Sequence, residues 1–186
     1  MRTHGHAKPR SRVKPRKPVT RVELAPLLKR DGPTLFRWIN DRDTVLFNAP
    51  YRPVHATQHD AWLASLADRR DAVIFAIRLA RSGRLIGTCQ LLSIDRVHRS
   101  AELQIRIGEE KSRGLGYGTE AVRLLVDFAF RDLNLHRVWL QAFATNERAL
   151  RAYERAGFAR EAVRREDAYI DGEFVDVIVM GRLNRG

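Results

Sequence analysis

The sequence contains a single cysteine, Cys89, among its 186 residues. One cysteine cannot form a disulfide within the chain, and without a second it cannot build a cysteine-based metal site. His4 and His6 are too few and too loosely placed to indicate another kind of metal site. We therefore expect no bound metal, a reducing compartment, and a Cys89 side chain buried in a strand as a small apolar residue.

Long apolar runs are also missing from the sequence. No segment approaches the length that a membrane-spanning helix needs, and the N-terminus lacks the apolar core of a signal peptide. With 44% hydrophobic residues, the chain can still bury one ordinary core. These features predict a soluble, cytoplasmic protein with one folded domain and no membrane contact.

Acidic residues are absent from residues 1–21, which hold eight of the 34 lysines and arginines of a chain with net charge +12. Three prolines and few apolar residues mean that this segment cannot offset the entropic cost of ordering. We expect a flexible basic arm over 1–21 and a single domain over 22–186. The arm could bind RNA or a ribosome through weak, salt-sensitive phosphate contacts. A solubilising extension, or a start codon assigned too early, explains it equally well.

Hydrophobic periodicity divides the region after the arm into alternating elements. The expected strands lie at about residues 22–27, 72–79, 84–92, 102–107 and 137–144, followed by a terminal hairpin around Asp171-Gly172. The expected helices lie at about residues 33–40, 58–66, 119–133 and 146–156. The second helix should begin at an N-cap Thr57 and turn Trp62 inward. The pattern predicts an α/β (α+β) architecture with a mixed sheet and about four helices.

Three glycines alternate in Arg113-Gly-Leu-Gly-Tyr-Gly118, between an expected strand and the strongest expected helix. Glycine lets the chain bend tightly and lets an anion approach the backbone without meeting a Cβ atom. The helix that begins near Thr119 directs unpaired N–H groups to the same place, and Arg113 adds a charge. The segment therefore predicts an anion-binding loop.

Other phosphate-binding loops fit this segment less well. The ATP-binding pattern Gly-x-x-x-x-Gly-Lys-Ser/Thr does not occur in the chain. Gly116-Tyr-Gly118-Thr-Glu-Ala121 formally matches a dinucleotide-binding pattern, but its glycines come well after the strand that ends at Ile107. A glycine-rich turn without a ligand would explain one glycine, but hardly its combination with Arg113 and a helix start.

Three segments together resemble the GNAT superfamily of N-acetyltransferases. Arg113-x-x-Gly116-x-Gly118 is similar to the family's Gln/Arg-x-x-Gly-x-Gly/Ala loop. Ala101-Glu-Leu-Gln-Ile-Arg-Ile-Gly and Asn146-Glu-Arg-Ala-Leu-Arg-Ala-Tyr-Glu-Arg-Ala-Gly-Phe resemble the RimJ/RimL-type branch. That branch includes ribosomal-protein N-terminal acetyltransferases and spermidine acetyltransferases. The resemblance covers about residues 22–183 and leaves the basic arm unexplained.

This resemblance implies the GNAT fold, a V-shaped, mostly antiparallel sheet that opens between strands at about 102–107 and 137–144. Acetyl-CoA, the donor, would lie in the opening, with its pantetheine amides on the backbone of 105–108 and its pyrophosphate on the N–H groups of 114–118. The implied cofactor-binding residues are Ile105, Ile107, Gly108, Arg113, Gly114, Leu115, Gly116, Tyr117, Gly118, Thr119, Asn146 and Tyr153. Asn146 could instead cap its helix.

The resemblance also implies roles in the chemistry. Acetyl transfer needs an uncharged amine and a stabilised oxyanion, for which a backbone N–H around 105–107 is the expected donor. Tyr153 matches a family tyrosine that faces the sulfur and would protonate the CoA thiolate, although helical tyrosines usually pack. Glu102 is the candidate general base, acting through water. Asp95, His98 and bulk water are alternatives.

The amine acceptor is expected to bind near the first two helices, their loop and the terminal hairpin. Asp41 and Asp43 lie in that loop and could attract a cation, but a polyamine site should need more acids. A peptide α-amine, an amino sugar and an aminoglycoside all stay open, as does a homodimer, which is common among related enzymes. Two other functions also stay open: an RNA- or ribosome-binding protein that uses residues 1–21, and an acyl-CoA sensor without catalysis.

Overall fold

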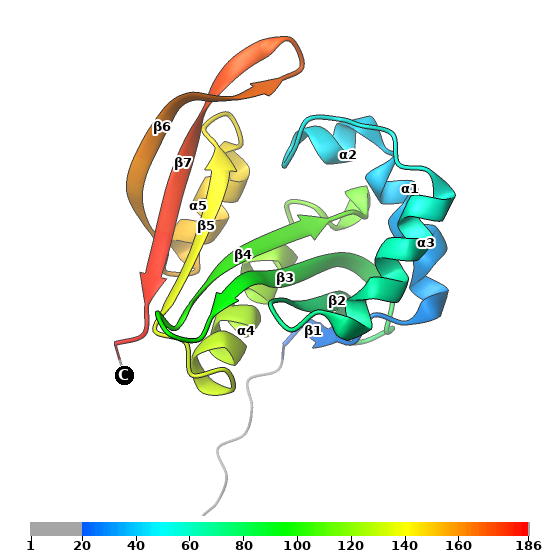
Figure 1. Cartoon of the computed structure of the whole chain (residues 1–186), viewed down its shortest axis with the longest axis horizontal. Coiled ribbons are helices and arrows are strands. Elements are labelled where there is room, and N and C mark those ends of the chain that lie inside the picture. The colour runs from blue at the N-terminus through cyan, green and yellow to red at the C-terminus, as the bar shows by residue number, and fades with distance from the viewer. Residues whose placement is uncertain (1–19, 186) are drawn as a thin grey trace, which may run out of the picture.

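One parallel pair of strands, β4 (Ser100–Ile107) and β5 (Arg137–Phe143), lies at the centre of the sheet. The computed structural model of the chain describes residues 20–185, so the predictions for the arm, apart from its last two residues, lie outside the described residues. Seven strands in this part of the chain form one sheet in the order β1-β2-β3-β4-β5-β7-β6 (Figure 1). All neighbouring pairs except β4–β5 are antiparallel. The strands are β1 (Val22–Ala25), β2 (Val73–Leu79), β3 (Leu85–Asp95), β4 (Ser100–Ile107), β5 (Arg137–Phe143), β6 (Ala159–Ile170) and β7 (Glu173–Leu183).

The two predicted hairpins are confirmed, together with their turns. Gly83, between β2 and β3, has a φ of 65°. Asp171 and Gly172, between β6 and β7, have φ values of 52° and 91°. Positive φ at both central residues is the type I′ geometry that matches the right-handed twist of flanking strands.

The helices number five in the described residues, one more than expected. They are α1 (Gly32–Ile39), α2 (Arg42–Leu46), α3 (Ala56–Ser65), α4 (Tyr117–Arg131) and α5 (Glu147–Arg155), with short 3-10 turns at Lys29–Asp31, Leu66–Asp68 and Glu110–Ser112. The additional helix, α2, starts where Asp41 accepts a hydrogen bond from the Thr44 N–H at 3.1 Å. None of these helices is long and apolar enough to cross a membrane.

Two expectations about α3 were wrong. Its N-cap is His55 rather than Thr57, because the Gln58 side chain accepts a hydrogen bond from the His55 N–H at 3.1 Å and closes the first turn there. Trp62 is 36% exposed instead of buried in the core. His59 takes the buried place on this helix, with its ring bonded to the Gly32 carbonyl at 3.0 Å.

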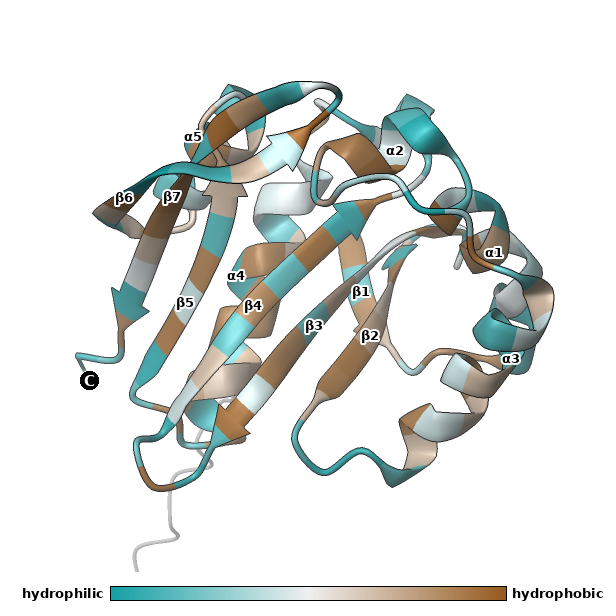
Figure 2. Ribbon diagram, turned by 45° about the horizontal axis from the view of Figure 1, so that its top comes forward, coloured by the Kyte–Doolittle hydropathy of each residue, from teal (hydrophilic) through white to brown (hydrophobic). Residues whose placement is uncertain are grey.

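The main core lies between the sheet and α4, which contacts β1, β3 and β4. The apolar stripe of α4 is buried as its periodicity predicted, through Val122, Leu125, Val126 and Ala129. Cys89 is buried in β3, and burial raises the pKa of its thiol, so this residue packs and does not act as a thiolate. Figure 2 shows the alternation of apolar and polar residues along β4 and β5, which gives the sheet two chemically different faces.

The parallel pair is short, and the two strands then separate. β4 and β5 pair only over residues 100–102 and 137–139. Beyond Glu102, β4 keeps its pairing with β3 but has no strand on the β5 side, whereas β5 continues along β7. The predicted V-shaped opening is therefore present, and it exposes the edge of a central strand inside the protein (Figure 1).

A buried ion pair ties β2 to the segment before α1. The Arg78 Nη2 donates to Asp31 Oδ2 at 2.6 Å, and the two side chains are 8% and 5% exposed. The same Asp31 oxygen accepts from the Leu28 N–H at 2.8 Å. Removing one partner of such a pair leaves the other charge buried without compensation.

We expect Arg78→Met to lower the free energy of unfolding by about 3 kcal/mol, because Asp31 would lose its counter-charge. The measurement is urea denaturation at unchanged m-value. Arg151→Met is the matched control, since its pair with Glu147 is exposed and should contribute less than about 1 kcal/mol. Equal losses in the two variants would contradict this account of Arg78.

Candidate functional site

Two cavities lie beside the unpaired part of β4. The larger has a volume of about 910 Å³ and lies on the sheet face of β3 and β4, next to α1 and α3. The smaller has a volume of about 160 Å³ and lies between the end of β4, the glycine loop (residues 113–118) and α5. They share the lining residues Phe47, Asn48, Ile105, Arg106, Asn146, Ala149 and Tyr153. These shared residues join the two cavities into one cleft.

The glycine loop has the geometry that an anion site needs. Gly114 and Gly116 have φ values of 77° and 83°, which residues with a Cβ atom rarely adopt. Gly116 is the N-cap of α4, so the unpaired N–H groups of the first helical turn follow it directly. Gly114, Gly116, Gly118 and Thr119 all line the smaller cavity. A negative group in this cavity would meet the positive end of a 15-residue helix.

Arg113 holds the loop in place through protein contacts. Its Nε donates to the Ile107 carbonyl at 3.0 Å, and its Nη2 donates to the Gly108 carbonyl at 3.1 Å and the Thr44 hydroxyl at 2.7 Å. These bonds join the end of β4 to α2. Arg113 still lines the smaller cavity, so its charge acts on that cavity from the wall.

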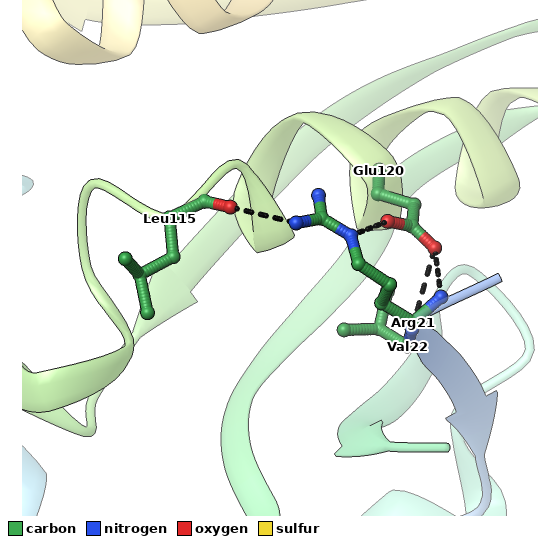
Figure 3. A network of polar contacts seen from close by, with 4 residues as sticks. All are labelled: Arg21, Val22, Leu115 and Glu120. Carbon is green, nitrogen blue, oxygen red and sulfur yellow. Dashed lines mark hydrogen bonds and ion pairs between the residues drawn. The ribbon is translucent and has the colours of Figure 1, made fainter. Parts of the chain in front are cut away.

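A second arginine, Arg21, braces the loop from the other side (Figure 3). Its Nη1 donates to the Leu115 carbonyl at 3.1 Å, and its Nε donates to Glu120 Oε2 at the same distance. Its backbone N–H also bonds Glu120, and its guanidinium lies 5.1 Å from the centre of the Tyr117 ring. Arg21, the last residue of the expected basic arm, thus connects β1 to the start of α4.

Three of the predicted cofactor-binding residues do not line either cavity with their side chains. The Leu115 side chain is 54% exposed, and Tyr117 stacks with Arg21. Gly108 packs directly on α1, because a Cβ atom there would lie 2.0 Å from Trp38 Cδ2. These residues can contribute to a binding site only through their backbone atoms.

Tyr153 lies where the two cavities meet. It comes from α5, is 7% exposed, and packs against Phe158 with ring centres 6.2 Å apart. Burial raises the pKa of its hydroxyl to about 12, because the charged phenolate would be desolvated. The group therefore stays a proton donor at neutral pH.

Asn146 has the capping role that the sequence left open. Its Oδ1 accepts from the Ala149 N–H at 3.2 Å at the start of α5. Its Nδ2 donates to the Phe47 carbonyl at 3.2 Å, which ties α5 to the end of α2. Because it also lines both cavities, it remains close to any ligand in the cleft.

Among the acidic candidates, Glu102 lines the larger cavity. Its Oε1 accepts from Gln104 Nε2 at 3.1 Å on the same strand face. Asp95 and His98 line neither cavity, and the Asp95 carboxylate instead accepts the N–H groups of His98 and Val97, which lower its pKa. Asp41 and Asp43 also lie outside both cavities. Within residues 20–185, no three His, Cys, Asp or Glu side chains are placed to share a metal ion.

Several cleft residues were not found from the sequence. Asn48 donates to the Ile105 carbonyl at 3.3 Å, and the Phe47 ring lies under the guanidinium of Arg148 at 5.1 Å. Arg148 and Arg155 line the smaller cavity from α5, where their spacing of seven residues puts them on one helix face. That spacing is the pattern by which the sequence could have indicated the two arginines. No sequence pattern indicated Phe47 and Asn48, because their partners are distant in the sequence.

The chain is similar to known acetyltransferases in sequence. The profile of the acetyltransferase (GNAT) domain matches residues 21–159. The chain is 38% identical over 93 residues to the spermidine N(1)-acetyltransferase of Vibrio cholerae, a match that covers 50% of this chain and 53% of that protein. It is 36% identical over 107 residues to the putative ribosomal N-acetyltransferase YdaF of Bacillus subtilis, covering 58% of each. The chain thus matches a little over half the length of these relatives.

The structural match is longer. The spermidine N-acetyltransferase from Vibrio cholerae, solved in complex with CoA and spermine, is similar with a TM-score of 0.82 and 26% identity, over 88% of this chain and 95% of that one. This match confirms the predicted fold. The profile match extends over most of the chain and confirms the predicted family. This chain therefore belongs to the GNAT family of acetyltransferases, among relatives of the RimJ/RimL type.

Proposed function

We propose that the chain is an acetyl-CoA-dependent N-acetyltransferase that acts on a primary amine of a small molecule or a protein N-terminus. The position of Tyr153 carries this proposal. On one side of Tyr153 the smaller cavity ends at the glycine loop, and on the other the larger cavity contains Glu102. A donor and an acceptor can therefore meet at this residue from opposite sides, which suits direct attack in a ternary complex.

The backbone of β4 would hold the pantetheine arm. A residue in an antiparallel pair directs its N–H and C=O groups to the same side. The carbonyls of Ile105 and Ile107 accept from Asn48 and Arg113, which do not belong to β3, so these residues face the opening. Their N–H groups face the same way and are available to a pantetheine carbonyl or to the thioester oxygen. Backbone N–H groups aimed at that oxygen would stabilise the oxyanion.

The pyrophosphate would lie on the N–H groups of residues 114–118, at the start of α4. Here the roles of Leu115 and Tyr117 are limited to their backbone groups, and Gly108 contributes in the same way at the end of β4. Arg148 and Arg155 add positive charge to this cavity from α5. Helix dipole, unpaired N–H groups and arginines all favour a phosphate at one place.

Glu102 is suited to remove the proton that the attacking amine must lose. It lies on the wall of the larger cavity, where a water molecule could connect it to the amine. Its hydrogen bond from Gln104, which in turn accepts from Gln90 at 2.8 Å, fixes the direction of the carboxylate. The arrangement is that of a positioned base at the acceptor end of the cleft.

Tyr153 would donate to the CoA sulfur as the tetrahedral intermediate collapses. A phenol with a pKa near 12 is a weaker acid than an ordinary thiol, whose pKa is about 8.5. The thiolate, however, would form in the same desolvated place, and desolvation raises its pKa as well. A hydrogen bond from the Tyr153 hydroxyl can therefore stabilise the leaving sulfur and complete the proton transfer.

The overall proposal is tested by free-thiol release from acetyl-CoA in the presence of a panel of amines. We expect thiol release that depends on both substrates, with a matching acetylated product in the mass spectrum. Tight binding of acetyl-CoA with no turnover on any amine would favour an acyl-CoA sensor instead.

Gly116→Asp should weaken acetyl-CoA binding at least about 100-fold, because a φ of 83° is strained for a residue with a Cβ atom and the new carboxylate adds negative charge beside the phosphate site, where its Cβ would lie 3.1 Å from Arg21 Nη2. The affinity is measured by calorimetry. Gly83→Asp is the matched control: Gly83 also has a positive φ, but lies in a turn where its Cβ would contact nothing within 4 Å. Unchanged affinity in Gly116→Asp would remove the glycine loop from the proposed site.

Tyr153→Phe should lower kcat roughly 100-fold and leave acetyl-CoA binding nearly unchanged, since only the proton donor is lost. Tyr169→Phe is the control, because Tyr169 lines the larger cavity but is 56% exposed. In the wild type, kcat should not fall through Tyr153 ionisation until the pH approaches 12, because burial favours the protonated form. A wild-type kcat in Tyr153→Phe would exclude the residue as the acid.

A further inference from the structure

The charges on the wall of the larger cavity are not those of a site for a polycation. The arginines that line it are Arg69, Arg106 and Arg164, and the acids are Glu102 and Asp167. A polyamine carries several positive charges and would need an excess of acids to compensate them. This cavity has an excess of arginine instead, among the residues that line it within 20–185.

Two of the three arginines are paired with protein groups. The Arg69 guanidinium binds Asp71 at 3.1 Å, and Arg164 binds Asp167 at 2.7 Å together with the side-chain oxygen of Gln141. Their charges are therefore compensated locally. Neither is available to a ligand without loss of an existing ion pair.

Arg106 has no such partner. Its guanidinium makes no hydrogen bond or ion pair with any residue in 20–185, and its Nε atom is buried without a partner. Burial lowers the pKa of this guanidinium, which reflects the cost of a desolvated charge. The residue is half-buried and only its Nε is fully enclosed, so its Nη atoms, which have no partner within 20–185, are accessible to a ligand in the cavity.

The place of Arg106 limits what that ligand can be. Arg106 lines both cavities and follows Ile105 on β4, so it lies where the thioester would meet the acceptor. The pantetheine and thioester portions of the donor carry no charge, and the phosphates would lie at the glycine loop. The acceptor remains as the source of a compensating anion.

We propose that Arg106 binds an oxyanion, a carboxylate or a phosphate, that is carried by the amine acceptor. This inference rests on the proposed acetyltransferase function and narrows its substrate class to amines that bear a negative group. The anion at Arg106 and the base at Glu102 lie on the same face of β4, on opposite sides of Gln104. An acceptor held at Arg106 can thus extend its amine along the strand toward Glu102 and Tyr153.

The test uses matched acceptors that differ only in the anion. Glycine, β-alanine and γ-aminobutyrate are each compared with their carboxamides, and phosphoethanolamine is compared with ethanolamine, by kcat/KM with acetyl-CoA. We expect one oxyanion series to be preferred about 10- to 100-fold by the wild type, because a neutral analogue leaves the unpaired guanidinium in the cavity wall without a counter-charge. The series that shows the preference distinguishes carboxylate from phosphate.

The variants assign that preference to one residue. Arg106→Gln should abolish the preference for the anionic acceptor, mainly by raising its KM. Arg106→Lys should keep part of this preference, and the control Arg69→Gln should keep all of it. Acetylation of only the neutral amines or spermidine by the wild type would overturn the inference and leave the acetyltransferase proposal standing. No acetylation of any acceptor would count against both. An equal loss for both members of a pair in Arg106→Gln would also overturn the inference.

Thermal stability gives a second readout without any acceptor. Arg106→Met keeps the aliphatic stem and removes an unpaired charge, so it should raise the Tm of the free protein by roughly 2–4 °C. Arg78→Met, which breaks a buried ion pair, should lower it. A lower Tm in Arg106→Met would show that the guanidinium stabilises the fold and would contradict its assignment to a ligand.

Discussion

The separation of β4 from β5 after Glu102 is the feature on which the site depends. A strand in the middle of a sheet normally satisfies its backbone groups on both sides, and unsatisfied groups inside a protein cost free energy. Here the β5 side of β4 is left for side chains and for a ligand. An extended molecule with amide groups, such as pantetheine, is suited to take the place of the missing strand. We therefore propose that the fold creates a binding site by omitting part of a sheet.

The segment from Arg42 to Asn48 connects the two halves of the sheet across this opening. Asn48 and Thr44 bond to the β4 half, through the Ile105 carbonyl and the Arg113 guanidinium. The Phe47 carbonyl accepts from Asn146 on α5, and Arg42 pairs with Asp171 in the β6–β7 turn. These contacts connect the β4 side of the opening to the β5 side, although β4 and β5 form no backbone pairing there. Phe47 and Asn48 of the same segment line both cavities. The segment therefore contacts both the opening between β4 and β5 and the larger cavity, where we place the acceptor.

Local patterns in the sequence predicted the parts of the structure that local physics determines. The glycine loop, the Asp171-Gly172 turn and the apolar stripe of α4 follow from backbone freedom and from periodicity within a few residues. The family resemblance supplied the opening between β4 and β5. Two local signals were missed, the Asp41 cap that starts α2 and the His55 cap that Gln58 closes. The exposed position of Trp62 was also missed, because it is set by packing between residues distant in the sequence. The isolation of Arg106 likewise depends on distant residues, because absence of a partner is visible only after folding.

A crystal structure of the protein with CoA would show whether CoA occupies the gap in the sheet. We expect pantetheine amides bonded to the backbone of Ile105 and Ile107, the pyrophosphate on the N–H groups of residues 114–118, and the sulfur within hydrogen-bond reach of the Tyr153 hydroxyl. CoA bound on another surface would contradict this placement. So would a ligand-bound structure in which β4 and β5 pair along their full length.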